Sequence, residues 1–243
     1  MVEADRSVAV NLPAHVEATL PDSWRQNGWL LVPGFLDSSE LEALRSEADR
    51  LWSDQSLFKS RGAVPNSAHR NDRLDPVIDL SDQFFDLAHD PRLMAAVESA
   101  LGGEARLMKD KFIAKPPGAG GYAAHQDGAY WPGMGLDVDR FLTAILFLDD
   151  SGVEKGTIEC APGLHDRLLT GADEVADPDE AELGEFSAIE AQAGDLLLLH
   201  SLTPHRSGPN HSAEMRRALL FTYGVDPRPD LYDIYQRGRR TLY

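Results

Sequence analysis

Two histidines and an aspartate in this 243-residue chain have the types and spacing of residues that bind one metal ion. His125 and Asp127 are two positions apart, and His205 follows 78 positions after Asp127. In an extended strand alternate side chains share a face, so we expect His125 and Asp127 to project together and Gln126 to point away. Two imidazoles and one carboxylate on one face of a metal leave the opposite positions open, as in Fe(II) sites that activate oxygen. The three residues therefore predict an oxygen-activating metal site.

The third ligand has two rivals, His200 and His211. His205 follows an apolar run, 195–200, that predicts a buried strand leading into a loop. It is followed by Ser207 and Gly208 and stands 11 residues before Arg216. We expect His200 to pack near the end of its strand with its nitrogens hydrogen-bonded locally. His205 is favoured over these rivals because its spacing to Arg216 resembles that of the distal histidine and the co-substrate arginine in a known family of oxygenases.

Four further motifs surround these residues in a fixed order. They are Lys115-Pro116-Pro117-Gly118, Gly128-Ala129-Tyr130-Trp131-Pro132, Ala161-Pro162-Gly163-Leu164-His165 and His205-Arg206-Ser207-Gly208-Pro209-Asn210. Together, from about Trp24 to Tyr223, they resemble the phytanoyl-CoA dioxygenase family of Fe(II)/2-oxoglutarate oxygenases. The resemblance implies a double-stranded β-helix (jelly-roll, cupin-like) core that holds Fe(II) near one open end through His125, Asp127 and His205. The implied co-substrates are 2-oxoglutarate and O2.

The resemblance also implies a co-substrate site. Arg216 would bind the far carboxylate of 2-oxoglutarate, because a desolvated anion needs a planar fork of charged donors. Ser207 resembles the family's hydroxyl that contacts the same carboxylate, and Lys111 occupies a strand position that often reaches the co-substrate. Arg217 is an adjacent competitor, but strand alternation lets only one arginine of the pair face inward.

Candidate substrate contacts are Tyr130, Trp131, Arg70 and Arg73. The two aromatic residues follow the first ligands directly, and aromatic packing at the mouth of the core is the alternative role for them. Arg70 and Arg73 belong to a basic loop, 59–76, which would orient an anionic or carboxylate-bearing substrate. We interpret the acidic segment 173–190 as a solvated loop and His165 as part of a structural turn.

The expected activity is hydroxylation of an unactivated C–H bond in a small polar metabolite or natural-product intermediate, with succinate and CO2 as co-products. Asp127 argues against halogenation, since related halogenases lack this carboxylate. Desaturation, epoxidation, cyclisation or epimerisation on the same platform stays open. The alternatives from other classes are a non-catalytic metal- or ligand-binding protein of cupin type and, lowest, a hydrolase, for which no Gly-x-Ser-x-Gly motif is present.

Composition limits the partners. The formal charge of −17 disfavours nucleic acids and anionic membranes, so a small-molecule substrate is the expected partner, while the oligomeric state stays open. The single cysteine, Cys160, excludes an intrachain disulfide framework and predicts a small buried side chain in a reducing compartment. Without a signal-like or membrane-spanning apolar run, we expect a cytoplasmic protein.

The elements that must position these residues follow from periodicity. We predict one domain over 1–243, with a helical part at about 13–103, a β-rich core at about 104–226, and a mainly β fold with flanking α-helices. Capping-box spacing at 37–40 and Asp90-Pro91 predict helices running to Trp52 and to the stop at Gly102-Gly103. Strands are expected at 105–115, 141–148, 156–160, 193–200 and 217–225.

Overall fold

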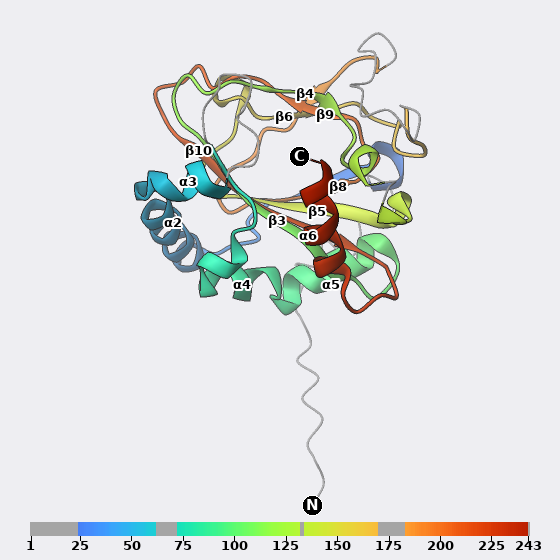
Figure 1. Cartoon of the computed structure of the whole chain (residues 1–243). Coiled ribbons are helices and arrows are strands. Elements are labelled where there is room, and N and C mark those ends of the chain that lie inside the picture. Colours follow the sequence, from blue (N-terminus) through green and yellow to red (C-terminus); the bar gives the residue numbers. More distant parts are fainter. Residues whose placement is uncertain (1–23, 62–71, 132–133, 170–182, 243) are drawn as a thin grey trace, which may run out of the picture.

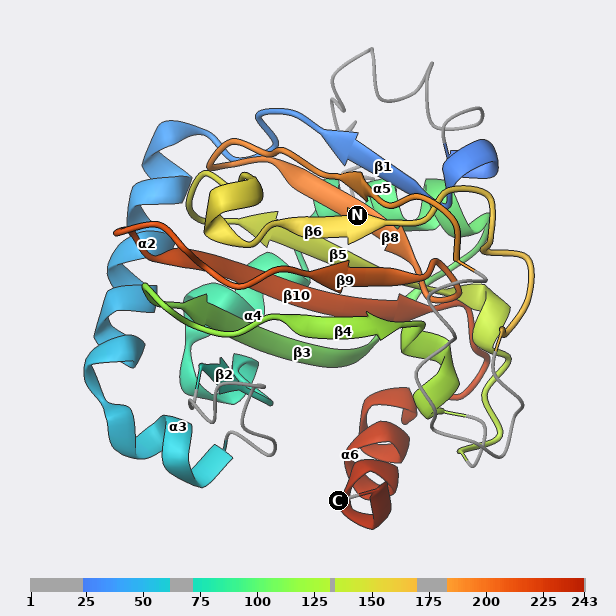
Figure 2. The ribbon, with the colours of Figure 1, turned by 90° about the horizontal axis from the view of Figure 1, so that it is seen from above.

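The computed structural model describes residues 24–61, 72–131, 134–169 and 183–242. Its strands form two antiparallel sheets that face each other (Figures 1 and 2). The large sheet has the order β1 (Trp29–Val32), β8 (Leu196–His200), β5 (Phe141–Phe147), β10 (Arg216–Gly224), β3 (Arg106–Lys115) and β2 (Arg73–Leu74). The small sheet has the order β4 (Tyr122–His125), β9 (His205–Ser207), β6 (Ile158–Cys160) and β7 (Ser187–Ala188).

Helices cover the face of the large sheet that turns away from the small one (Figure 1). They are α2 (Ser38–Ser53), α3 (Gln55–Arg61), α4 (Asp82–Ala88) and α5 (Pro91–Leu101). The predicted mainly β fold with flanking helices is confirmed. Short 3-10 helices occur at η1 (Ile78–Leu80), η2 (Asp127–Tyr130), η4 (Val138–Arg140) and η5 (Val153–Lys155).

The predicted helix signals hold in detail. Asp37 caps α2 by accepting hydrogen bonds from the backbone of Ser39 and Glu40, and the Glu40 side chain accepts one from the Asp37 backbone. Asp90 caps α5, which ends at Gly102 with a φ of 69°. These caps fix where the helices begin and end, and so how they lie on the sheet.

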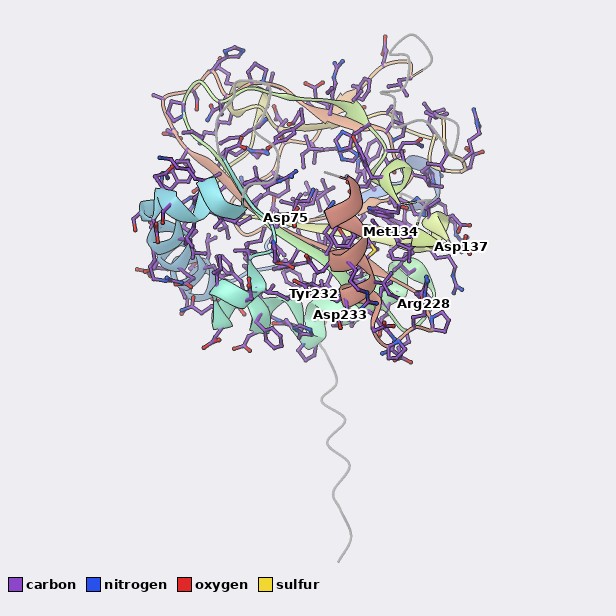
Figure 3. The ribbon with its side chains drawn as sticks, viewed as in Figure 1. Asp75, Met134, Asp137, Arg228, Tyr232 and Asp233 are labelled. Atoms are coloured by element: carbon purple, nitrogen blue, oxygen red, sulfur yellow. The ribbon has the colours of Figure 1, made fainter. Side chains whose placement is uncertain are left out.

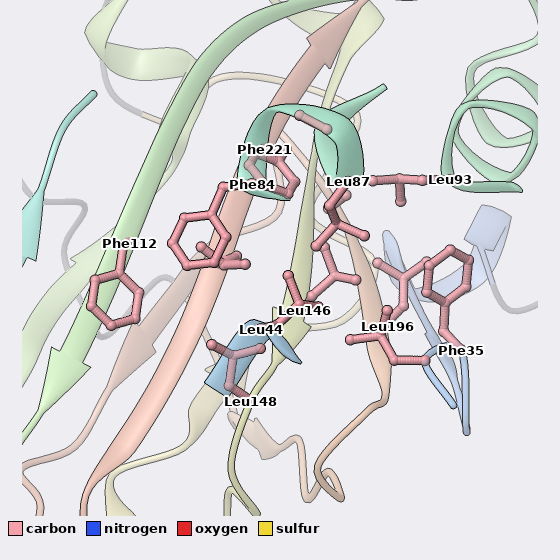
Figure 4. Close-up of a cluster of buried hydrophobic side chains, with 14 of the residues drawn as sticks. Phe35, Leu44, Phe84, Leu87, Leu93, Phe112, Leu146, Leu148, Leu196 and Phe221 are labelled. Atoms are coloured by element: carbon pink, nitrogen blue, oxygen red, sulfur yellow. The ribbon is translucent and has the colours of Figure 1, made fainter. Parts of the chain in front are cut away.

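The main hydrophobic core lies between these helices and the large sheet (Figure 4). On β3 and β10, Phe112 and Phe221 face α4, where they meet Phe84. Because side chains alternate along a strand, the residues next to Phe112 on β3 and next to Phe221 on β10 face the small sheet. These residues line the space in which the candidate site lies.

Several features differ from the prediction. Strands β2, β4, β7 and β9 lie outside the predicted strand ranges, and β7, within the segment 173–190 for which the sequence predicts a solvated loop, pairs with β6. Strand β1 pairs with β8 inside the part predicted as helix and loop, and helix α6 (Leu231–Leu242) follows the predicted β-rich core and packs on β3. Strand β4 ends at His125, and Asp127 begins the 3-10 helix η2, so the two residues do not share one strand as predicted.

The described part of the chain contains no helix long and apolar enough to cross a membrane.

Candidate metal and co-substrate site

The pairing of β4 with β9 places His125 directly opposite His205. The ring centroids are 4.2 Å apart. Asp127 follows from the first turn of η2, and one potential ligand atom from each of the three residues lies within 4.8 Å of the others. Two paired strands and the turn that follows β4 thus bring all three predicted ligands to one point.

Both imidazoles are held in the form that a metal requires. His125 Nδ1–H donates to the carbonyl oxygen of Ala123 at 2.8 Å, and His205 Nδ1–H donates to that of Thr203 at 3.0 Å. This tautomer leaves the Nε2 lone pair of each ring available. Desolvation, reinforced by the neighbouring His205, lowers the pKa of His125 to about 3, and desolvation also lowers the pKa of His205. Both rings are therefore neutral near neutral pH.

The carboxylate of Asp127 is buried and supported from the large sheet. Thr143 Oγ1 donates to Asp127 Oδ2 at 3.0 Å, and the Thr143 and Thr222 hydroxyls lie 2.9 Å apart. Burial alone would raise the pKa of Asp127, but the positive charges of Lys109 and Lys111 outweigh it and hold this pKa well below its usual range. The group is therefore ionised and ready to bind a cation.

His200, the rival ligand, is used within the fold. Its Nε2–H donates to the carbonyl oxygen of Asp139 at 2.9 Å, while Nδ1 accepts a bond of 3.2 Å from the Leu202 backbone. Both ring nitrogens are occupied, as predicted for a histidine packed at the end of its strand.

The three residues open into a cavity of about 350 Å³ between the two sheets. Its apolar wall consists of Ile113, Ile145, Ile158, Leu199, Ala218 and Leu220. Arg216 and Ser207 line the cavity as well, so the predicted co-substrate residues share one space with the candidate metal ligands.

Arg216 has unused hydrogen-bonding capacity in this cavity. It is only 3% exposed, its Nη1 donates a long bond of 3.4 Å to the Gly156 carbonyl, and its Nε has no hydrogen-bond partner in the described structure. Desolvation lowers the pKa of Arg216 to about 10. A buried guanidinium with spare donors is suited to binding a carboxylate.

Arg217 faces the opposite side of the sheet. Its guanidinium binds both carboxylate oxygens of Asp149, at 2.8 and 2.9 Å. Strand alternation therefore separates the two arginines as predicted, with Arg216 inside.

Lys115 is a site residue that the sequence reasoning missed. It is the register partner of Arg216, is fully buried, and donates to Ser207 Oγ at 2.9 Å and to the Gly208 carbonyl at 2.6 Å. Desolvation, with a contribution from the charge of Arg216, lowers the pKa of Lys115 to about 7. Its position could have been found by alternation, because 111 and 115 share one face of the predicted strand.

Lys111 lines the cavity on the side of Asp127 rather than of Arg216. Desolvation and the charge of Lys109 lower the pKa of Lys111 to about 7, against the raising effect of Asp127. Lys109 and Arg73 line the same part of the cavity. Lys111 therefore belongs to a group of three cations in the cavity, and its contact with the co-substrate stays a prediction.

The two adjacent aromatic residues, Tyr130 and Trp131, lie in different environments. Tyr130 lines the cavity, with its ring centroid 5.9 Å from that of His125. Trp131 is 1% exposed and packs against Phe141 in a hydrophobic cluster, so the structure places it outside the cavity lining. Arg70 lies outside the described residues, and so does most of the predicted basic loop.

The family model for phytanoyl-CoA dioxygenase (PhyH) matches residues 24–218. The chain belongs to the phytanoyl-CoA dioxygenase family. This confirms the resemblance seen in the sequence. The chain is therefore an Fe(II)- and 2-oxoglutarate-dependent dioxygenase that uses O2 and acts on a small molecule.

Two curated relatives and one solved structure show how widely this family varies. The chain is 28% identical over 227 residues to methylphosphonate hydroxylase of Gimesia maris, which covers 91% of this chain and 86% of the relative. It is 30% identical over 226 residues to ectoine dioxygenase of Halomonas elongata, covering 83% and 68%. The structure of the epimerase SnoN with Fe3+, α-ketoglutarate and nogalamycin RO matches with a TM-score of 0.73 and 27% identity, covering 88% and 84%. The jelly-roll core is thereby confirmed.

The donor set fits the family's cofactors. Two neutral imidazoles and one carboxylate form the open-sided ligand set of non-haem iron, and the unpartnered Nε of Arg216 fits a buried carboxylate.

Proposed function

We propose that this dioxygenase hydroxylates a C–H bond of a small polar metabolite, releasing succinate and CO2. The observation that carries the proposal is the shared cavity, which joins the cluster of His125, Asp127 and His205 to the buried guanidinium of Arg216. A non-catalytic cupin-type protein would need the three ligands but would give Arg216 no purpose.

In this proposal His125, Asp127 and His205 hold Fe(II), which when bound supplies the oxygen-activating chemistry that is coupled to decarboxylation of 2-oxoglutarate. Arg216 binds the far carboxylate of the co-substrate. Ser207 contacts the same carboxylate, and Lys115 holds the Ser207 hydroxyl in place. The apolar wall between the two ends accommodates the co-substrate's methylene groups and limits access of water.

Hydroxylation is favoured over halogenation because Asp127 occupies the third protein position of the ligand set. Epimerisation, as named for SnoN, uses the same platform and is the second candidate for the outcome. Hydroxylation replaces a hydrogen of the substrate by a hydroxyl group, whereas epimerisation puts a hydrogen back on the opposite face of the same carbon. Product analysis distinguishes the two.

We propose further that 1–243 acts as one catalytic domain in the cytoplasm, without nucleic acid or membrane partners. The family match over 24–218 and the single buried cysteine support the domain and the compartment, and the charge of −17 supports the choice of partner.

The test is the weak visible charge-transfer band that forms when Fe(II) and 2-oxoglutarate are added to the purified protein without oxygen. We expect the band in the wild type and its loss in His205→Ala and Asp127→Ala. The matched controls are His211→Ala and Asp166→Ala, which remove an exposed histidine and an exposed carboxylate and should leave the band intact. A wild type without the band, at unchanged thermal stability, would overturn the assignment.

A further inference from the structure

A cluster of three cations lines the cavity beside the candidate metal ligands. Lys109 and Lys111 project from β3, and Arg73 projects from β2, which pairs with β3. The charges of Lys109 and Lys111 act on Asp127, and those of Arg73 and Lys109 act on Lys111. The cluster is therefore compact and adjacent to the place where iron would be held.

The two lysines have no direct acidic partner in the described part of the chain. Desolvation opposes the charge of Lys109, but Tyr235, Asp127 and Asp75 outweigh it and raise the pKa of Lys109, whereas desolvation and Lys109 lower that of Lys111 to about 7. Among the described residues, neither Lys109 Nζ nor Lys111 Nζ makes a hydrogen bond or an ion pair, although both side chains are buried, and Lys109 lies 5.4 Å from the ring centroid of Tyr235. Burying a charge without a partner is costly. At functional sites, buried charges of this kind are found where a bound ligand supplies the opposite charge.

Arg73 is only loosely paired. Its Nε is buried without a hydrogen bond in the described structure, and the nearest carboxylate oxygen, Asp75 Oδ2, lies 4.0 Å away.

Figure 3 shows Asp75 and, on α6, Tyr232. Tyr232 binds Asp110 at 2.6 Å on the helix-covered face of β3, so α6 is anchored against the strand that carries both lysines.

The cavity keeps an excess of positive charge when Fe(II) and 2-oxoglutarate are bound. Fe(II) and 2-oxoglutarate bring equal and opposite charges, and the far carboxylate of 2-oxoglutarate is matched by Arg216. Asp127 is the one carboxylate among the described residues that line the cavity. With Asp75 set against Arg73, a net excess of positive charge from Lys109 and Lys111 therefore stays available for a further molecule.

The cavity also limits the size of that molecule. Its volume of about 350 Å³ lies at the small end of ligand sites, which span roughly 300–1,000 Å³. The same space must hold 2-oxoglutarate. What remains favours a small molecule.

We propose that Arg73, Lys109 and Lys111 bind the oxyanion of a small phosphonate, a dianionic tetrahedral group on a short carbon unit. The proposal deepens the proposed function and rests on it. Three cations on two adjacent strands match a group with three charged oxygens, whereas a carboxylate offers two oxygens and one charge. Methylphosphonate, named for the Gimesia maris relative, has this chemistry.

The reaction balances without a further reagent. One oxygen atom of O2 enters the substrate C–H bond to give C–OH, and the other enters 2-oxoglutarate, which loses CO2 and becomes succinate. The phosphorus group keeps its oxidation state and serves to hold the carbon beside the metal ligands.

The experiment is calorimetric titration of methylphosphonate, without oxygen, into protein loaded with Fe(II) and 2-oxoglutarate. We expect binding, and a loss of affinity of about 10- to 100-fold in each of Arg73→Met, Lys109→Met and Lys111→Met, because each removes a charged hydrogen-bond donor. Lys109→Arg and Lys111→Arg should recover part of it. The control, Arg106→Met, removes a cation from β3 that pairs with Glu104 away from the cavity, and should bind as the wild type does.

The charge-transfer band is recorded on each sample, which separates the two proposals. A normal band without methylphosphonate binding overturns the phosphonate inference and leaves the proposed function standing. A missing wild-type band overturns the proposed function instead, and with it the inference. Equal affinity for propionate or methanesulfonate would overturn the dianion assignment, as would full affinity in the double variant Lys109→Met/Lys111→Met.

Discussion

His125 and His205 are register partners across β4 and β9, and each donates its Nδ1 proton to the carbonyl two residues earlier in its own segment. The same kind of hydrogen bond to a backbone carbonyl thus orients both rings. Because strand pairing sets the distance between them, metal loading requires no rearrangement of these strands.

Thr143→Val should weaken iron binding about 10- to 100-fold, as expected when a partner of a metal-binding carboxylate is removed. The change keeps the shape of the side chain and removes the bond to Asp127 Oδ2. Thr222→Val, which alters only the next hydroxyl along, should have a smaller effect. Anaerobic titration with Fe(II) measures the iron affinity of both variants. An affinity of Thr143→Val equal to that of the wild type would contradict the role of Thr143.

Arg216→Met should raise the KM for 2-oxoglutarate about 10- to 100-fold, because it removes a charge-assisted donor facing the cavity. Arg217→Met is the matched variant on the opposite face. It should leave this KM unchanged and lower the free energy of unfolding by about 1–3 kcal/mol, through loss of the Asp149 contacts. The reverse pattern would show that the wrong arginine had been assigned.

Gly156→Ala should destabilise the protein by at least about 1–2 kcal/mol, the strain of a left-handed residue that is not glycine. The φ of Gly156 is 67°, and an added Cβ would lie 2.3 Å from the Gly208 carbonyl oxygen. The KM for 2-oxoglutarate should also rise, since the Gly156 carbonyl accepts from Arg216. Gly152→Ala, where no atom lies within 4 Å of the new Cβ, should melt like the wild type in a thermal denaturation series.

Much of this arrangement was predictable because it is encoded locally. The capping residues Asp37 and Asp90 fix helix starts through contacts within three residues, and alternation alone assigns Arg216 and Arg217 to opposite faces. The strand ranges agree to within a few residues for the same reason. The pairing of β1 with β8 and the docking of α6 on β3 depend on contacts between distant segments, which local patterns do not encode.

The pair Tyr130 and Trp131 shows where local reasoning fails. Both follow the ligand pair directly, and the sequence leaves substrate contact and aromatic packing open for each of them. Asp127 begins a 3-10 helix rather than continuing β4, so neighbouring side chains turn in directions that strand alternation does not describe. The Lys109 and Lys115 positions were accessible to that rule, but their burial depends on β10 and on the small sheet.

Trp131→Ala should therefore lower the free energy of unfolding by about 3–5 kcal/mol, as for other buried aromatic residues cut back to alanine. Tyr130→Phe should leave stability nearly unchanged and alter the turnover of substrate relative to that of 2-oxoglutarate. Chemical denaturation and the ratio of product to succinate measure the two effects. Unchanged coupling in Tyr130→Phe would remove this residue from the proposed substrate contacts.

The cations beside the metal ligands belong to β2 and β3, whereas His125, His205 and Ser207 belong to β4 and β9 of the facing sheet. The three cations and the two histidine ligands consequently lie on different sheets, while Arg216 lies on β10 of the same sheet as the cations. Exchanging Lys109 or Lys111 for neutral side chains would therefore change substrate binding and, because both charges also favour ionised Asp127, the affinity for iron as well.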